Sequence, residues 1–184
     1  MSCLPGFERG RSDGANGDDW YTPPWLLAWL PPIDLDPCYA EGSAVVAAHT
    51  LDLRRGDDGL TDPWPGDGVV WLNHPFSNGS AWLKRARQEG RRRVVVVLTP
   101  AVPGDGPWDA HVWGKAAWVG FIAGRITFFD AAGKNETKGR GHALLIYGPR
   151  QQANACRDHV MAAAVQHPKA PWWVPGNWDL RGKR

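Results

Sequence analysis

The segment "RRRVVVVLTP" at residues 91–100 limits the possible folds more than any other part of this chain. Four consecutive valines and a leucine lack the apolar–polar alternation of a strand that has one face in water. A strand of this kind is buried on both faces, as in parallel sheets that helices cover on each side. The run therefore predicts an α/β domain with an inner strand here.

The remaining segments fit such a domain. We expect helices over residues 20–30, with Thr22 as the N-cap, over 77–90, ending at Gly90, and over 152–166. Residues 44–53 fit either a helix or a strand. Further strands are predicted at 33–37, 69–72, 116–124, 125–130 and 142–148. This order predicts a Rossmann-like three-layer sheet that is mostly parallel, with an antiparallel strand pair near the C-terminus.

One domain accounts for most of the length. Residues 1–19 are polar and Gly-rich and predict a flexible leader, residues 20–167 form the domain, and 168–184 form an irregular basic tail. No apolar run approaches a membrane span, and no signal peptide is recognisable, so we expect a cytoplasmic protein. The Cys and His residues show no metal-ligand spacing, which predicts no metal site.

Polar and aromatic residues stand at the ends of two predicted strands. Asp36 and Pro37 end the first, and "NHPF" (residues 73–76) follows the second. In sheets of this class, ligands bind beyond the carboxyl ends of the strands. Asn73 offers an amide oxygen and Phe76 a flat ring, which suits a planar group that carries an NH2. A nucleobase turned out of its duplex is such a group.

"NHPF" resembles the Asn-Pro-Pro-Phe form of the signature of DNA amino-methyltransferases, Asp/Asn/Ser-Pro-Pro-aromatic. The surrounding chain resembles the phage-type DNA N6-adenine methyltransferases of the Dam family, whose segments occur in the same order over most of residues 19–148. The matching segments are "DDWYTPPWLL", "DLDPCYA", "DDGLTDPWPGDGVVWLNHPFSNGSAWLKRA" and "VGFIAGRITFFD", followed by "ALLIYG".

The resemblance implies an enzyme that moves a methyl group from S-adenosylmethionine to the N6 amine of adenine in double-stranded DNA, in a phage or its bacterial host. Asn73 and the main-chain carbonyl of His74 would accept hydrogens from the amine beside Pro75, and Phe76 would stack on the base. Catalysis would rest on positioning and electrostatics. The sequence does not define the oligomeric state, and a monomer is compatible with it. The cofactor would lie near Thr22, Pro23, Asp36, Pro37, Asp58 and Gly59.

The sequence departs from the family pattern at two points. His74 stands where the first Pro of the signature is usual, and the Gly-rich cofactor loop of methyltransferases is missing from "DPCYAEGS". Asp52 is an alternative to Asp58 for the cofactor ribose. Cys38 follows Pro37, as in the Pro-Cys nucleophile of cytosine C5-methyltransferases. Since no other motif of that class occurs, we interpret it as a small residue packed beside the cofactor loop.

Basic residues predict where DNA phosphates would bind. The densest run is "KRARQEGRRR" (84–93), and a second group lies at 134–140; for any single residue, a solvated helix face or loop is the alternative. The loops at 101–117 and 130–142 would recognise the target sequence. Trp108 and Trp113, in the first of these loops, could touch a base. The predicted DNA-binding residues are Lys84, Arg91, Arg125, Lys138 and Arg140.

Three other functions stay open at this point. The same fold could methylate the N4 amine of cytosine, because that base also presents an exocyclic amine. His74 could leave a methyltransferase-like DNA binder without activity. The 12 Trp could instead belong to a non-catalytic binding module, for example for carbohydrate, which would display a row of exposed Trp on one sheet face.

Overall fold

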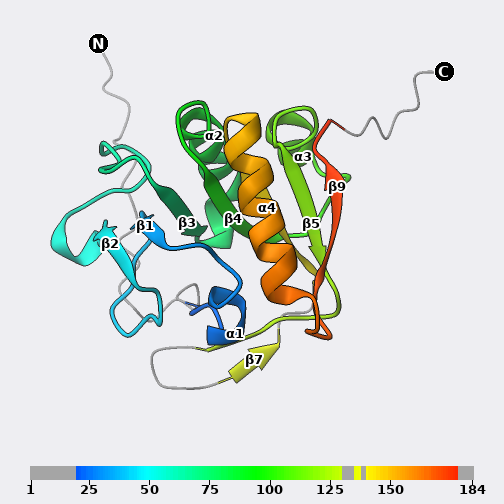
Figure 1. The fold of residues 1–184 in the computed structure, drawn as a ribbon. Coiled ribbons are helices and arrows are strands. Elements are labelled where there is room, and N and C mark those ends of the chain that lie inside the picture. Colours follow the sequence, from blue (N-terminus) through cyan, green and yellow to red (C-terminus); the bar gives the residue numbers. More distant parts are fainter. Residues whose placement is uncertain (1–19, 130–134, 138–139, 178–184) are drawn as a thin grey trace, which may run out of the picture.

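The computed structural model describes residues 20–129, 135–137 and 140–177, and its main feature is a mixed sheet (Figure 1). Within those residues, seven strands form the sheet in the order β2-β1-β3-β4-β8-β5-β9. These strands are β1 (Ile33–Asp36), β2 (Ala47–Thr50), β3 (Val69–Asn73), β4 (Val95–Pro100), β5 (Trp118–Ile122), β8 (His142–Tyr147) and β9 (Pro171–Pro175).

The strand directions confirm the expected Rossmann-like α/β class. Strands β2, β1, β3 and β4 are mutually parallel. Strand β8 lies between β4 and β5 and runs antiparallel to both, and β9 pairs antiparallel with the outer edge of β5. The carboxyl ends of β1, β3, β4 and β5 therefore lie at one edge of the sheet, where its ligands are expected.

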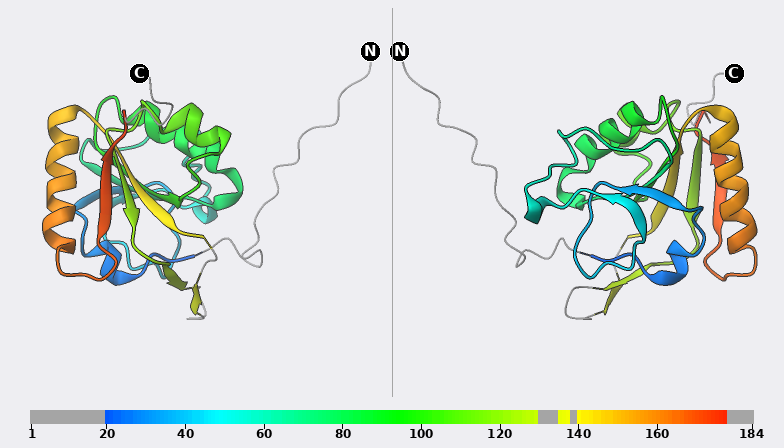
Figure 2. Two further views of the ribbon diagram at one scale, coloured as in Figure 1. Left: turned by 90° about the vertical axis from the view of Figure 1, so that its right-hand side faces the viewer. Right: turned by 60° about the vertical axis from the view of Figure 1, so that its left-hand side comes forward.

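The valine run forms β4, and its side chains divide between two cores. Val96 and Leu98 pack on the side of α4 (Arg150–Ala164) and α1 (Pro24–Leu27). Val95 and Val97 pack on the side of α2 (Gly79–Glu89) and α3 (Gly106–His111). Figure 2 shows α4 on one side of the sheet and α2 with α3 on the other. Each buried valine contributes roughly 1.5–3 kcal/mol, so both layers depend on this strand.

Helix α2 ends at Gly90, as predicted, for a reason of packing. The φ of Gly90 is −61°, which any residue adopts, but a Cβ here would lie 2.4 Å from the Cβ of Tyr147. Only glycine lets the end of α2 approach β8 this closely. A one-turn 3-10 helix, Phe76–Asn78, precedes α2, and Asn78, the N-cap of α2, makes no side-chain cap hydrogen bond.

Several expected elements differ in extent. The helix expected over 20–30 is reduced to Pro24–Leu27, and Thr22 does not cap it, since the N-cap is Pro23. Residues 44–53 resolve as strand β2 followed by a 3-10 helix, Leu53–Arg55. The loop between residues 101 and 117 contains α3. None of the helices in the described residues is long and apolar enough to cross a membrane.

The C-terminal region contains the largest correction. The irregular tail expected from residue 168 includes β9, which joins the sheet through β5. The loop expected between 130 and 142 includes β7 (Asn135–Thr137), which forms a two-stranded sheet with β6 (Thr127–Phe129). The leader expected at 1–19 lies outside the described residues.

Much of the basic run holds the fold together. Arg93 is buried and donates to the main-chain oxygens of Trp64 and Pro65 at 2.7 and 2.8 Å. Its guanidinium also pairs with Glu89 at 3.3 Å, as do Arg92 at 2.8 Å and Arg85 at 3.4 Å. This cluster fixes the loop that leads into β3.

We expect Arg93→Leu to lower the free energy of unfolding by roughly 3 kcal/mol, because the change leaves buried carbonyl oxygens without a donor. Urea unfolding followed by circular dichroism measures this loss. Arg91→Leu, in the same run but exposed, is the matched control and should change stability by less than about 0.5 kcal/mol. Equal losses in the two variants would contradict a structural role for Arg93.

Candidate active site

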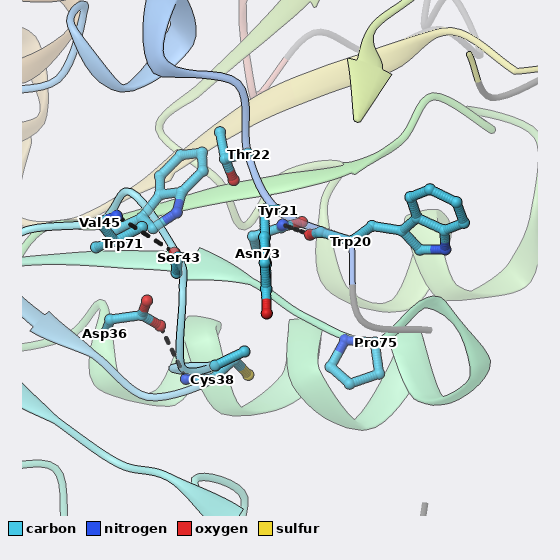
Figure 3. A pocket seen from close by; sticks show the side chains of 11 residues that line it. Trp20, Tyr21, Thr22, Asp36, Cys38, Ser43, Val45, Trp71, Asn73 and Pro75 are labelled. Carbon is cyan, nitrogen blue, oxygen red and sulfur yellow. Dashed lines mark hydrogen bonds between the residues drawn. The ribbon is translucent and has the colours of Figure 1, made fainter. Parts of the chain in front are cut away.

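A pocket opens where β1 and β3 end, at the edge of the sheet predicted to bind ligands (Figure 3). Because β1 and β3 are paired in parallel, Asp36 and Asn73 come to the same edge and line one cavity. We call this cavity the strand-end pocket. Its lining residues are Trp20, Tyr21, Thr22, Asp36, Cys38, Ala40, Ser43, Val45, Trp71, Asn73 and Pro75.

The Asn73 side chain has a fixed orientation. Its Nδ2 donates to the main-chain oxygen of Trp20 at 2.9 Å, a contact across 53 residues of sequence. With the nitrogen committed, the oxygen of the amide is left as an acceptor. Within the described residues no donor is bonded to that oxygen. A rigid, available acceptor at a strand end is what binding an NH2 group requires.

Asp36 is a buried acid in the same pocket. Its side chain is 4% exposed, and Oδ1 accepts from the backbone N–H of Cys38 at 2.9 Å. Burial raises the pKa of Asp36 to about 7, and the hydrogen bond from Cys38 offsets only part of this effect. The carboxyl group therefore changes its charge near neutral pH.

The loop between β2 and β3 packs against Pro37, next to Asp36, at a glycine. A Cβ on Gly59 would lie 2.1 Å from the main-chain oxygen of Pro37, so a larger residue would force the loop away. Burial, and then the charges of Asp36 and Asp58, raise the pKa of the Cys38 thiol. Asp58 thus lies close enough to act on the pocket electrostatically, although it does not line it.

Asp52, the alternative to Asp58, has a local structural role. It is buried and caps the 3-10 helix Leu53–Arg55 by accepting from the Arg54 N–H at 2.9 Å. Asp58 Oδ1 accepts from the Leu60 N–H at 2.9 Å. Both carboxylates thus shape the loop between β2 and β3, and Asp58 is the one whose charge acts on Cys38.

The signature residues adopt distinct roles. Pro75 lines the strand-end pocket. His74 is buried; its ring stacks on Trp82 at 6.5 Å, and its Nδ1 lies 3.0 Å from the Pro75 oxygen. Phe76 does not line the pocket and instead contacts the rings of His74, Phe128 and His142, at centroid distances of 6.0, 6.2 and 5.6 Å.

Residues 20–22 form one wall that the strand pattern did not predict. Tyr21 pairs with Phe129 of β6: its backbone nitrogen donates to the main-chain oxygen of Phe129 at 2.7 Å. Its hydroxyl donates to the main-chain oxygen of Glu41. Thr22, expected at the cofactor, does line the pocket, whereas Pro23 is buried beside it. Trp20 and Tyr21 lie within the segment "DDWYTPPWLL", which was the available signal for them.

The predicted DNA-binding residues are distributed over the surface. Arg125 follows β5 and Arg140 precedes β8; both are exposed at the edge that holds the pocket. Lys84 is exposed on α2, and Arg91 is exposed beyond its far end. Lys138 lies outside the described residues.

Tryptophan mostly fills the core. Trp108 is fully buried, so the expectation that it touches a base is wrong, and Trp113 donates to the Pro103 oxygen at 3.0 Å. Within the described residues Trp172 is strongly exposed. Its neighbour Trp173 packs against Gly120 instead, where an added Cβ would lie 2.9 Å from the Trp173 ring. The row of exposed Trp that a binding module needs is not found in this part of the chain.

The comparisons with known proteins point in the same direction as the pocket. A family model described as DNA N-6-adenine-methyltransferase (Dam) matches residues 10–165. A search of the curated proteins found no match. The matched range contains the strand-end pocket, the signature and the sheet strands from β1 to β8, which is well over half of the chain. The chain belongs to the Dam family of DNA adenine methyltransferases.

Proposed function

We propose that this protein transfers a methyl group from S-adenosylmethionine to the N6 amine of adenine in double-stranded DNA. The observation that carries the proposal is the strand-end pocket, which joins the buried Asp36 to the oriented amide of Asn73. Membership of the Dam family supports DNA as the substrate. The base would enter this edge of the sheet after turning out of the duplex.

Asn73 would act on the amine by accepting one of its hydrogens. The lone pair of an adenine amine is delocalised into the ring, so the amine is a weak nucleophile. Acceptors at Asn73 Oδ1 and at the His74 main-chain oxygen would draw both hydrogens out of the ring plane and localise the lone pair. The Trp20 oxygen fixes the Asn73 amide beforehand, so no reorganisation is needed during the reaction.

The residues of the pocket fit the cofactor. When bound, S-adenosylmethionine supplies a methyl group on a sulfonium cation. Asp36 offers a carboxylate for its hydroxyl or ammonium donors, and the Thr22 hydroxyl lines the same wall. Trp20, Tyr21 and Trp71 also line the pocket, and we propose that an aromatic ring among them contacts the cofactor cation. We propose that Pro37, Asp58 and Gly59 support the Asp36 loop, and that Pro23 supports Thr22.

Two residues near the pocket bear on alternative chemistry. The raised pKa of Cys38 keeps its thiol protonated, which disfavours thiolate attack on a cytosine ring carbon. The buried His74 ring is held by Trp82, so we propose that His74 contributes its main-chain oxygen to the reaction and its ring to packing. We place the target duplex along the edge that carries Arg125 and Arg140.

The product decides between adenine and cytosine, which both present an exocyclic amine. We expect DNA incubated with the purified protein and S-adenosylmethionine to yield N6-methyladenine after digestion to nucleosides and mass spectrometry. Detection of N4-methylcytosine would reassign the substrate, and the absence of any methylated nucleoside would overturn the proposed activity.

The variant His74→Pro tests whether His74 limits turnover. We expect lower stability and no gain in turnover, because the ring contact with Trp82 is lost.

Asn73→Ala should lower turnover by roughly 100-fold or more, a typical cost of removing one preorganised hydrogen-bonding group. Cofactor binding, measured by calorimetry, should persist and show that the pocket has folded. Asn78→Ala is the matched control, because Asn78 is exposed in the same loop and makes no side-chain cap. Full turnover in Asn73→Ala would contradict the role assigned to its amide.

The pKa of Asp36 predicts a pH dependence of cofactor binding. If the ionised carboxylate binds the cofactor, the competent fraction grows as pH rises through about 7. Affinity should therefore increase roughly tenfold between pH 6 and 8, because it scales with that fraction. Calorimetry across this range should find little pH dependence in Asp36→Asn. The same slope in both proteins would assign the effect to another group.

The same carboxyl should affect stability with the opposite sign. Between its ordinary pKa of 3.8 and about 7, the folded chain holds a proton that the unfolded chain has lost. The free energy of unfolding therefore falls as pH rises through this interval. Asp36→Asn should stabilise the protein more at pH 8 than at pH 5 in urea unfolding. An equal effect at both values would show that Asp36 is not buried as described.

A further inference from the structure

The basic residues of α2 belong to two groups with different environments. Arg85, like Arg92 and Arg93 beyond the helix, is paired with Glu89. Lys84 and Arg87 lie on another face of α2, and Arg91 is exposed just beyond its C-terminal end. No carboxylate of the described residues forms an ion pair with these three.

Helix α3 and the turn after it extend this face. Arg87 Nη1 donates to the Ala110 oxygen at 3.4 Å, which places its guanidinium against α3. Lys115 is exposed just beyond α3, and its Nζ is bonded only to the main-chain oxygen of Trp113 at 3.0 Å. We call Lys84, Arg87, Arg91 and Lys115 the α2–α3 basic surface.

Three of the four cations of this surface act on a common point. Burial first, and then Arg87, Lys84 and Lys115, lower the pKa of His111 at the end of α3. Their positive potential therefore converges between the two helices. Like charges placed this close destabilise a fold by a few tenths of a kcal/mol per pair when nothing neutralises them. Such a cost is expected where an anionic partner binds.

The position of the surface favours DNA as that partner. Helix α2 starts directly after the signature loop, so Lys84 and Arg87 stand about 7.5 and 12 Å along its axis from Gly79. A duplex carries one negative charge per about 1.7 Å of its axis. A cation row that leads away from the pocket over such distances suits a phosphate backbone.

We propose that the α2–α3 basic surface binds the phosphates of duplex DNA that flanks the target base. This inference rests on the proposed function only for the choice of DNA as the partner. It also separates the basic run into Lys84, Arg87 and Arg91, which bind DNA, and the three arginines around Glu89, which hold the fold.

The test is the salt dependence of duplex binding, which needs no knowledge of the target sequence. We expect Lys84→Gln/Arg87→Gln/Lys115→Gln to bind a fluorescein-labelled, mixed-sequence duplex of about 30 base pairs more weakly than the unchanged protein. The slope of log Kd against log salt, measured by anisotropy between about 50 and 200 mM salt, should fall by about 2 to 3. The circular dichroism spectrum and the urea unfolding midpoint of the variant serve as the check on folding, which does not depend on the proposed activity.

A matched control removes cations that already have carboxylate partners. Arg54 pairs with Glu41 and Asp52, and Arg55 with Asp57. Arg54→Gln/Arg55→Gln should leave the slope close to that of the unchanged protein, whereas Lys84→Gln/Arg87→Gln should lower it by about 2. Equal slopes in these two double variants would overturn the proposal, because net charge alone would then explain the effect.

The outcomes separate this surface from the catalytic proposal. A lower slope without any methylated product would support the surface and reject the activity. Methylated product with an unchanged slope in the triple variant would reject the surface and support the activity. Tighter binding to an RNA duplex of the same sequence, lost in the triple variant, would overturn the assignment to DNA.

Discussion

The hydrogen bond from Asn73 Nδ2 to the Trp20 oxygen is the contact on which the geometry of the site depends. It ties the end of β3 to residues 20–22, which come long before it in the chain. Tyr21 joins the same segment to β6 through Phe129 and to the loop after β1 through Glu41. The end of β3, strand β6 and the loop after β1 are thus held by one short segment, and the orientation of the Asn73 amide is set before any ligand binds.

The sequence was sufficient to predict the edge of the sheet at which this pocket opens. The valine run required an inner strand with a core on each face, and the structure divides its side chains between two helix layers. Parallel pairing then brings the carboxyl ends of neighbouring strands to one edge, and Asp36 and Asn73 are the residues at those ends. This prediction rests on local pattern and on a general property of parallel sheets, so it needed no side-chain detail.

Other features depend on contacts between distant residues and could not be predicted. Strand β9 looks irregular in sequence because prolines stand at both of its ends, and pairing with β5, where Gly120 makes room for Trp173, produces the strand. The run at 84–93 shows many cations, but not that Glu89 and the Trp64 and Pro65 oxygens take three of them. Helical spacing shows which residues share a face, and tertiary contacts decide which face is neutralised.

Two unfavourable charge arrangements remain, and they have opposite signs. Asp36 is a buried acid whose ionisation weakens the fold, since desolvation outweighs its hydrogen bond from Cys38. The α2–α3 basic surface collects cations without carboxylate partners among the described residues. The proposed ligands have complementary charges, a sulfonium cofactor for the pocket and a polyanion for the surface. Each ligand would neutralise the unfavourable charge at its own site. The repulsion and desolvation that lower the stability of the free protein at these two places would therefore contribute favourably to the free energy of binding.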